Sequence, residues 1–183
     1  PKSFLVNHFI SKIAQNMKNL ILIRHAKSSW NAPLLDKDRP LAKRGMQDAH
    51  LMSTNIDKHL PKTFTMLSST AKRASETAII FAQNMSCPLE SIIFKDELYT
   101  FDDRQLEKIV KSCNNDYDNV ILFGHNDAIT NFVNKFGNVF IENVPTSGFV
   151  SINFESSDWE SIDKGKTQKV IFPRDLKKYD SAN

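Results

Sequence analysis

The sequence predicts an α/β fold in which a mostly parallel central sheet lies between two layers of helices. Short aliphatic runs alternate along the chain with longer segments of helical periodicity, which is the order that such folds require. The runs are apolar throughout, as in strands that are buried on both faces. The length of 183 residues suits one domain of ordinary size. We therefore expect a single three-layer αβα sandwich.

The first part of the chain is expected to hold one strand, a long loop and a helix. Residues 19–24 form the first aliphatic run, and the polar segment 26–40 reads as the loop. Residues 41–59 predict a helix because apolar side chains recur at spacings of three and four. The stripe consists of Ala42, Met46, Ala49, Met52 and Ile56.

The middle of the chain repeats this alternation. A second strand is predicted at 64–67, and a helix with an alanine-rich apolar side follows over 71–82. A third strand at 92–94 is expected near an edge of the sheet. The candidates for the N-cap of the helix are Ser68, Ser69 and Thr70.

The remaining elements complete the sheet. We expect a helix over 103–113, a fully apolar strand at 120–123 and a helix through 129–136. Residues 149–154 alternate with period two and predict a strand, with which 159–162 is expected to pair. The tail from Pro173 onward is charged and is expected to fray.

The boundaries of the domain follow from the first strand. Met17 precedes it, so we expect a domain over 17–183 and an N-terminal extension over 1–16, with a short helix packed on the domain as the alternative. Asn7 and His8 interrupt the apolar pattern of this segment and no small-residue cleavage site follows, which argues against a signal peptide. No apolar run is long enough to cross a bilayer, so we expect no membrane partner.

Charge and cysteine content favour a cytoplasmic protein. The 24 basic and 21 acidic residues give a net charge of +3, which does not demand a nucleic-acid partner, and we expect none. Cys87 and Cys113 lie in no CxxC or Cys/His cluster, so we expect reduced thiols and no metal site. We further expect a monomer without a cofactor.

Polar residues follow three predicted strands at the point where each strand ends. The pair Arg24-His25 ends the first strand, 68–69 the second and 124–125 the fourth. Because the carboxyl ends of parallel strands meet at one edge of a sheet, these clusters are expected to converge there. A lone histidine after a strand is more often structural, so the functional interpretation depends on this convergence.

The converging residue types suit phosphoryl transfer. Arginine presents a planar fork to two phosphate oxygens, and Arg73 is near enough to the start of its helix to reach the site. A neutral imidazole is a competent nucleophile near pH 7, because its ordinary pKa is about 6.5. Attack would give a phosphohistidine that water then hydrolyses, with no need for a metal. These residues predict a phosphatase with His25 as its nucleophile.

Four segments resemble, in the same order, the signature elements of the histidine phosphatase superfamily, which includes the cofactor-dependent phosphoglycerate mutases. Residues 24–31 resemble its RHG signature, and 41–45 resemble the Leu-Thr-x-x-Gly element. Residues 69–78 resemble the Ser-x-x-x-Arg-Ala-x-x-Thr-Ala element, and 123–126 the Gly-His element. The resemblance covers residues 18 to about 155 and implies a phosphoglycerate mutase-like fold.

The resemblance implies roles for individual residues. His25 resembles the nucleophile that becomes phosphorylated, and Asn31 resembles a residue that contacts the phosphoryl group or the substrate. Ser28 and Asn126 are further candidates for phosphate or substrate binding, with organisation of the loop as the alternative for Ser28. The other positions of the implied phosphate pocket are Arg24, Arg73 and His125.

Two departures from the signature narrow the resemblance. Ala26 stands where most of the superfamily has Gly, so we expect ordinary backbone angles after His25. Lys27 replaces a frequent Glu. With the Asp-Arg-Pro-Leu segment 38–41, residues 24–30 resemble a branch of small proteins similar to the phosphohistidine phosphatase SixA, which have the core sheet and few insertions.

The proton donor is less clearly marked. An alkoxide leaving group needs a proton, and in the mutases and many phosphatases of the superfamily a Glu after the third strand supplies it. Glu97 has that position here, with a solvated Glu in a turn as the alternative, and its neighbours Asp96, Asp102 and Asp103 could substitute. An imidazole leaves more easily, so a weakly placed acid fits a phosphohistidine phosphatase.

The length of the connections bears on the substrate. About 25 residues separate the third and fourth predicted strands, which leaves little room for the insertions that close over small ligands in the superfamily. We therefore expect a phosphorylated protein carrying phosphohistidine as the partner, with a phosphomonoesterase acting on a small phosphate ester as the second hypothesis and a mutase as the least favoured. A non-catalytic module that binds phosphorylated partners would have lost a pocket residue, and all four are present.

Overall fold

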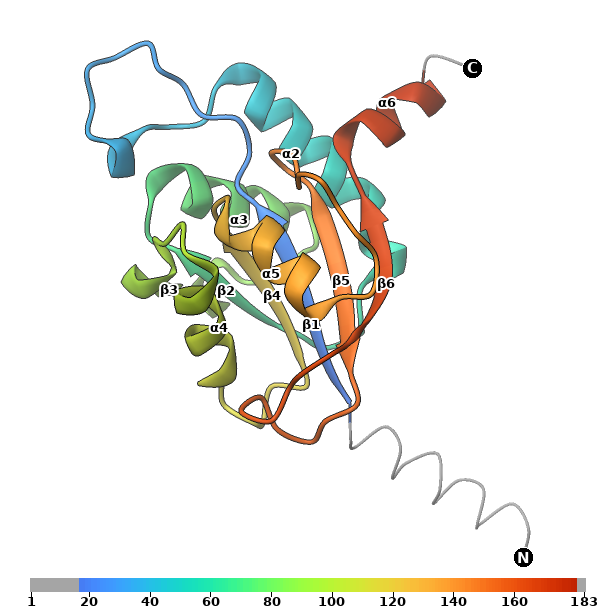
Figure 1. Ribbon diagram of the computed structural model, residues 1–183. Coiled ribbons are helices and arrows are strands. Elements are labelled where there is room, and N and C mark those ends of the chain that lie inside the picture. Colours follow the sequence, from blue (N-terminus) through green and yellow to red (C-terminus); the bar gives the residue numbers. More distant parts are fainter. Residues whose placement is uncertain (1–16, 181–183) are drawn as a thin grey trace, which may run out of the picture.

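The computed structural model describes residues 17–180, and the predicted extension 1–16 lies outside the described residues (Figure 1). A mixed sheet of six strands runs through this part in the order β3-β2-β4-β1-β5-β6. Strands β3, β2, β4 and β1 are parallel, and β5 and β6 are antiparallel to their neighbours. Their bounds are β1 Lys18–Arg24, β2 Thr65–Ser69, β3 Ile92–Lys95, β4 Asn119–Gly124, β5 Phe149–Phe154 and β6 Lys166–Ile171.

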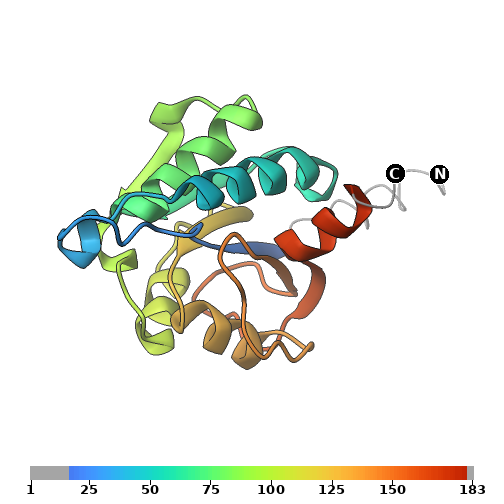
Figure 2. The ribbon, with the colours of Figure 1, turned by 90° about the horizontal axis from the view of Figure 1, so that it is seen from above.

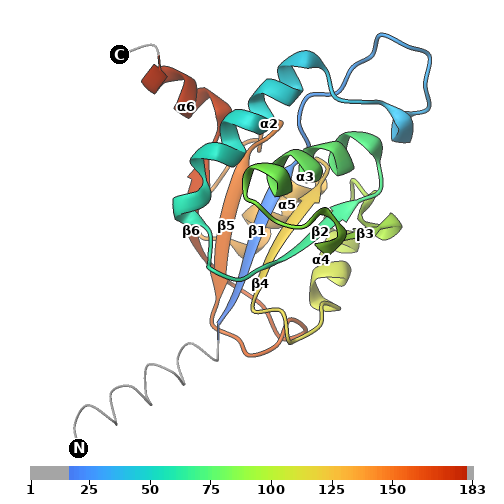
Figure 3. The ribbon, with the colours of Figure 1, turned by 180° about the vertical axis from the view of Figure 1, so that it is seen from behind.

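Helices cover both faces of the sheet, as the view from above shows (Figure 2). The α-helices are α2 Lys43–Asn55, α3 Lys72–Asn84, α4 Asp103–Lys111, α5 Ala128–Phe136 and α6 Pro173–Asp180. Helices α2 and α3 lie on one face (Figure 3), and α4 and α5 lie on the other. This arrangement confirms the predicted three-layer αβα sandwich. None of the described helices is long and apolar enough to span a membrane.

Strand β1 shows why the sequence folds into two cores. Leu20 and Leu22 face the cluster that contains Ile129 and Phe132 of α5. The alternate residues of β1, Ile21 and Ile23, face the cluster of α2 and α3. A strand with both faces buried therefore needs a continuous aliphatic run, which explains the pattern at 19–24.

The expected pairing of 159–162 with β5 is wrong, because β6 (Lys166–Ile171) takes that place. The indole Nε1 of Trp159 donates to the carbonyl oxygen of Tyr117 at 2.7 Å, and the ring is fully buried with Ile162 in the α4/α5 core. Trp159 and Ile162 are therefore core residues that a turn contributes, and they do not belong to a strand. Strand β6 is polar because it lies at an edge of the sheet.

The expected fraying from Pro173 is also wrong, since α6 runs from Pro173 to Asp180. Proline suits the first position of a helix because its missing N–H would have no helical partner there. The helix packs beside α2, where Nζ of Lys177 lies 2.5 Å from Oδ1 of the buried Asp48. Leu176 packs against the α2/α3 core.

Several element ends differ from the prediction. Helix α2 is shorter than 41–59 and Met46 is exposed, so the stripe starts at Ala49. None of the three expected residues is the N-cap of α3, which is Ala71, although Oγ of Ser69 accepts the Ala71 N–H at 3.2 Å. The described 3₁₀ turns are η1 Asp36–Asp38, η2 Asp57–His59, η3 Leu89–Ser91 and η4 Asp96–Leu98.

Candidate active site

The three polar strand ends lie side by side at one edge of the sheet, as predicted. Arg24 is the register partner of Gly124 across β1 and β4, and Ser68 is the partner of Phe123 across β2 and β4. The N–H of His25 donates to the carbonyl oxygen of Gly124 at 3.0 Å. The parallel pairing of β2, β4 and β1 therefore brings residues about 100 positions apart in the sequence into one site.

Both ring nitrogens of His25 are held by hydrogen bonds that determine which of them carries the proton. Its Nδ1 lies 2.8 Å from the carbonyl oxygen of Ala26, which can only accept, so Nδ1 carries the proton. Its Nε2 accepts a hydrogen bond from Nε of Arg73 at 3.2 Å and is therefore the unprotonated nitrogen. The N–H of Ala26 donates to Oγ1 of Thr77, which fixes the turn after the strand. Ala26 is not among the described residues of positive φ, as expected.

Both histidines of the site are neutral at ordinary pH. Burial lowers the pKa of His25 to about 3, and the Arg73 and Arg24 guanidiniums act in the same direction. Burial lowers the pKa of His125 to about 2, and the positive charges of Arg73 and Arg24 act in the same direction. Their ring centroids are 5.0 Å apart. Nε2 of His25 is thus unprotonated over the whole physiological pH range.

Arg73 connects His25 to the rim of the site. It lies in the first turn of α3 and is only 1% exposed. Besides contacting His25, its guanidinium donates from Nη1 to the main-chain oxygen of Asp36 at 2.5 Å and from Nη2 to Oδ2 of Asp36 at 2.9 Å. The fork of Arg73 therefore holds an anionic oxygen beside His25.

His125 forms the opposite wall. Its Nε2 lies 2.9 Å from Oγ of Ser69, and its ring packs against Tyr99 and Phe101 with centroids 5.4 Å away in each case. Its Nδ1 is buried and has no hydrogen-bond partner within residues 17–180. Nε of Arg24 is likewise buried without a hydrogen-bond partner in this part of the chain. A phosphate oxygen would satisfy either atom, which fits an anion-binding role for both residues.

Arg24 and Asn126 are anchored to the loop before β5. Nη1 of Arg24 donates to the carbonyl oxygen of Val144 at 2.8 Å. Nδ2 of Asn126 donates to Oδ1 of Asn143 at 2.8 Å, and Oδ1 of Asn126 accepts from Oγ1 of Thr130 at 3.0 Å. The side chain of Asn126 is therefore engaged in holding this loop against α5.

No hydrogen bond or ion pair joins the other predicted site residues to Arg24, His25, Arg73 or His125 in the described part of the chain. Oγ of the buried Ser28 accepts from Nη1 of Arg39 at 2.7 Å, which is the loop-organising alternative. Asn31 is exposed, and its N–H donates to Oγ of Ser29. Glu97 is exposed in η4 and its carboxylate has no hydrogen bond or ion pair among the described residues.

Asp36 is the site residue that the sequence did not indicate. Its Oδ1 accepts from Nε and Nη2 of Arg39 at 3.0 and 2.6 Å, and its Oδ2 accepts from the hydroxyl of Tyr99 at 2.6 Å and from Arg73. These donors hold the pKa of Asp36 well below its ordinary value despite the opposing effect of burial. An Asp in a polar loop carries no periodic signal, although the neighbouring Asp-Arg-Pro-Leu segment 38–41 marked the loop as unusual.

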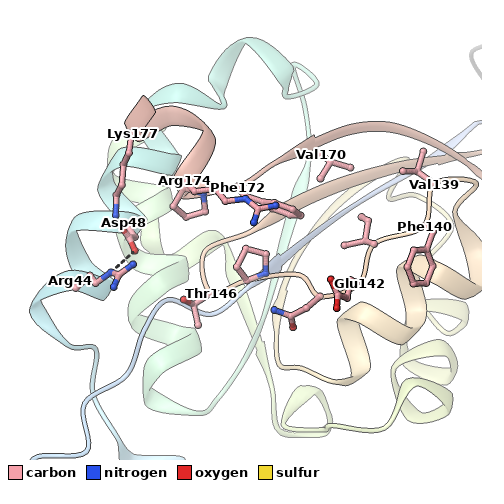
Figure 4. A pocket seen from close by; sticks show the side chains of 14 residues that line it. Arg44, Asp48, Val139, Phe140, Glu142, Thr146, Val170, Phe172, Arg174 and Lys177 are labelled. Atoms are coloured by element: carbon pink, nitrogen blue, oxygen red, sulfur yellow. Dashed lines mark ion pairs between the residues drawn. The ribbon is translucent and has the colours of Figure 1, made fainter. Parts of the chain in front are cut away.

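A hollow of about 640 Å³ lies beside the site (Figure 4). Figure 4 shows Arg44, Asp48 and Lys177 at one end and Val139 and Phe140 at the other. Asn143 lines the hollow, and its Oδ1 accepts from Nη1 of Arg24 at 3.5 Å, so this residue links the hollow to Arg24.

These groups can bind and transfer a phosphoryl group. Arg24 and Arg73 are cations of the kind that binds phosphoryl oxygens, and an unprotonated imidazole such as that of His25 is a competent nucleophile. The described residues contain no group of three or more His, Cys, Asp and Glu side chains placed to hold a metal ion.

Residues 20–99 match the family model of the histidine phosphatase superfamily (branch 1). The uncharacterized protein ML1117 of Mycobacterium leprae is 26% identical over 171 residues, which cover 82% of this chain and 98% of the relative. The uncharacterized protein MT1313 of Mycobacterium tuberculosis is 44% identical over 55 residues, or 30% of this chain. The matched segment spans only 35% of the length of the M. tuberculosis relative.

Solved structures share the fold. A protein histidine phosphatase SixA complexed with tungstate superposes with a TM-score of 0.73 at 20% identity, over 86% of this chain and 99% of that chain. A mycobacterial glucosyl-3-phosphoglycerate phosphatase has a TM-score of 0.60 at 13% identity, over 83% of this chain and 97% of that chain. At these identities the similarity establishes the fold.

Proposed function

We propose that the chain, whose residues 20–99 match the histidine phosphatase superfamily, is a phosphatase that forms a phosphohistidine intermediate on His25, and that its substrate is a protein phosphohistidine. The observation that carries the proposal is the unprotonated Nε2 of His25, placed 3.2 Å from Nε of Arg73. A nucleophile beside a guanidinium fork is what attack on a phosphoryl group needs.

The proposed reaction has two steps. Nε2 of His25 attacks phosphorus while Arg24, Arg73 and His125 hold the phosphoryl oxygens, and the leaving group departs. Water then attacks the phosphohistidine and releases phosphate. Through both steps Nδ1 of His25 keeps its proton and donates it in a hydrogen bond to the carbonyl oxygen of Ala26. This hydrogen bond stabilises the positive charge that the ring gains on phosphorylation.

The choice of substrate rests on the surroundings of the site. The rim carries the half-buried Tyr99 and the exposed Phe101, and the long 26–42 connection lies at its edge (Figure 1). The adjoining hollow offers a surface for the protein that bears the phosphorylated side chain. The similarity to the SixA structure points to the same class, whereas the similarity to the glucosyl-3-phosphoglycerate phosphatase favours a small ester as the second candidate.

The nucleophile is tested with p-nitrophenyl phosphate in the presence of a chelator. We expect His25→Ala to lose at least 100-fold in kcat, as loss of a nucleophile does, while His50→Ala, an exposed histidine of α2, keeps the wild-type rate. Acid-quench of the wild type should trap an acid-labile phosphoenzyme. Equal hydrolysis by His25→Ala and the wild type would exclude His25 as the nucleophile. Loss of wild-type activity in the chelator would show that the reaction needs a metal ion.

The substrate is tested by turnover. A phosphohistidine-bearing protein domain should be dephosphorylated with a higher kcat/KM than any member of a panel of small phosphate esters. A strong preference for one ester would replace the protein phosphohistidine with that ester.

A further inference from the structure

Asp36 places a carboxyl group beside the proposed phosphoryl site. It lies in η1, on the connection between β1 and α2, and its side chain is 42% exposed. One guanidinium, that of Arg73, contacts both Nε2 of His25 and Oδ2 of Asp36, at 3.2 and 2.9 Å. The acid is therefore separated from the nucleophile only by the group that must bind the phosphoryl oxygens.

Phosphate binding changes the surroundings of this carboxylate. The oxygens of a bound dianion compete with Asp36 for the N–H groups of Arg73. Asp36 then loses a cationic partner and gains a negative neighbour, and each change favours its protonated form. The hydroxyl of Tyr99 and the guanidinium of Arg39 still hold it at the rim. An acid that is ionised in the free protein would thus take up a proton when the substrate arrives.

Building on the proposed phosphatase function, we infer that Asp36 is the catalytic residue that protonates the leaving group and then activates water. In the first step the lone pair of His25 Nε2 forms a P–N bond to the phosphoryl group. The bond from phosphorus to the leaving atom breaks, which is a P–N bond in a phosphohistidine substrate and a P–O bond in an ester, and the leaving atom takes the carboxyl proton of Asp36. In the second step the Asp36 carboxylate takes a proton from the water that attacks phosphorus. The P–N bond breaks and its electron pair returns to the imidazole.

The surroundings of Glu97 favour Asp36 over it. Glu97 and Tyr99 share the segment after β3, but the Glu97 carboxylate makes no hydrogen bond or ion pair with the described residues, whereas the Tyr99 hydroxyl donates to Oδ2 of Asp36 at 2.6 Å. In the family pattern the acid lies in the segment after the third strand. Here that segment supplies Tyr99, which positions the carboxyl group of Asp36. The acid itself comes from the connection between β1 and α2.

The experiment compares two aryl phosphates whose leaving groups differ in their need for a proton. Asp36→Asn keeps the size of the side chain and removes the acid. We expect it to lower kcat/KM about 100-fold for phenyl phosphate, and less than about fivefold for p-nitrophenyl phosphate, whose phenolate leaves unassisted. Asp36→Glu should restore part of the rate on phenyl phosphate.

The controls separate this inference from the function on which it rests. An equal loss on both substrates would overturn it and assign Asp36 to holding Arg73 and the loop. A selective loss in Glu97→Gln, with Asp36→Asn unaffected, would overturn it in favour of Glu97. If His25→Ala keeps its activity, the proposed function fails. If His25→Ala is inactive and Asp36→Asn loses both substrates equally, only the inference about Asp36 fails. Melting temperatures of each variant establish that it is folded.

Discussion

His25 and His125 are neutral because the protein removes them from water, and this neutrality has a cost in stability at low pH. In the unfolded chain each ring has its ordinary pKa near 6.5. In the folded protein the pKa values are about 3 and 2. Between these values the unfolded chain binds more protons, so stability rises with pH and is lost as pH falls.

The first prediction follows from this difference. We expect the free energy of unfolding, measured by urea titration, to fall from pH 7 to pH 5 by about 2 kcal/mol for each of the two histidines. His125→Gln should remove about half of that fall, whereas His50→Gln, a change of an exposed residue, should leave it intact. The same pH dependence in wild type and His125→Gln would contradict the assignment.

The site residues differ in how far the sequence could predict them. Arg24, His25 and His125 follow strands directly, so the topology of the sheet determines where they lie. Asn31 and Glu97 lie on connections, whose course depends on contacts that no periodicity reveals. Asp36 was missed for the same reason, because its role depends on the positions of Arg39, Tyr99 and Arg73 around it.

At the scale of elements, the contact between α2 and the segment after β1 sets the position of the nucleophile. Gly45 lies in the first turn of α2, and a Cβ atom there would be 2.1 Å from the carbonyl oxygen of Lys27. That oxygen also accepts the N–H of Ala42 at 2.8 Å. Because Lys27 is two residues from His25, the absence of a side chain at Gly45 determines how closely the helix approaches the site.

We therefore expect Gly45→Ala to destabilise the protein by about 1–3 kcal/mol through overpacking and to lower kcat. In an unconstrained helix the same change adds about 0.5–1 kcal/mol of stability, so the sign is informative. Gly124→Ala is the matched control for stability, since its Cβ would meet side-chain atoms of Leu122 and Ile129 at 3.4 and 3.5 Å. Thermal unfolding measures the effect. If the Gly45→Ala protein is as stable as the wild type, the backbone has moved to accommodate the added Cβ atom.

The elements themselves were predictable where burial imposes a pattern. Strands β1 and β4 are buried on both faces and gave unambiguous aliphatic runs. Strand β6 and helix α6 are largely polar, and their structure depends on pairing with β5 and packing beside α2. Trp159 is of a residue type that is common in strands, but its side chain is buried in the core from a turn. Such tertiary contacts outweigh local propensity.

On the scale of the whole molecule, the hollow that Asn143 lines is the surface on which the proposed protein substrate would dock. Phe140 lines the hollow and is 82% exposed, which is a large exposed fraction for an aromatic side chain. Asn143 and Val144, from the same loop, contact Arg24. A protein whose phosphorylated side chain enters the site would therefore cover Phe140.

We predict that Phe140→Ala raises the KM for a phosphohistidine-bearing protein domain about tenfold, in proportion to the lost apolar burial. The KM for p-nitrophenyl phosphate should not change, because that substrate is too small to reach the hollow. Leu89→Ala, which removes an exposed apolar side chain from η3, serves as the control. An unchanged KM for the protein substrate would show that it docks elsewhere.

The two tryptophans of the chain differ in a way that gives the protein its own optical reporter. The indole of Trp159 is fully buried in the core, whereas Trp30 is 71% exposed and stacks on Arg39, whose guanidinium carbon lies 3.6 Å from the ring centroid. Arg39 also holds Asp36. A rearrangement of Asp36 on phosphate binding would therefore alter the emission of Trp30 and leave that of Trp159 constant, so that fluorescence could follow the first milliseconds of substrate binding without a label.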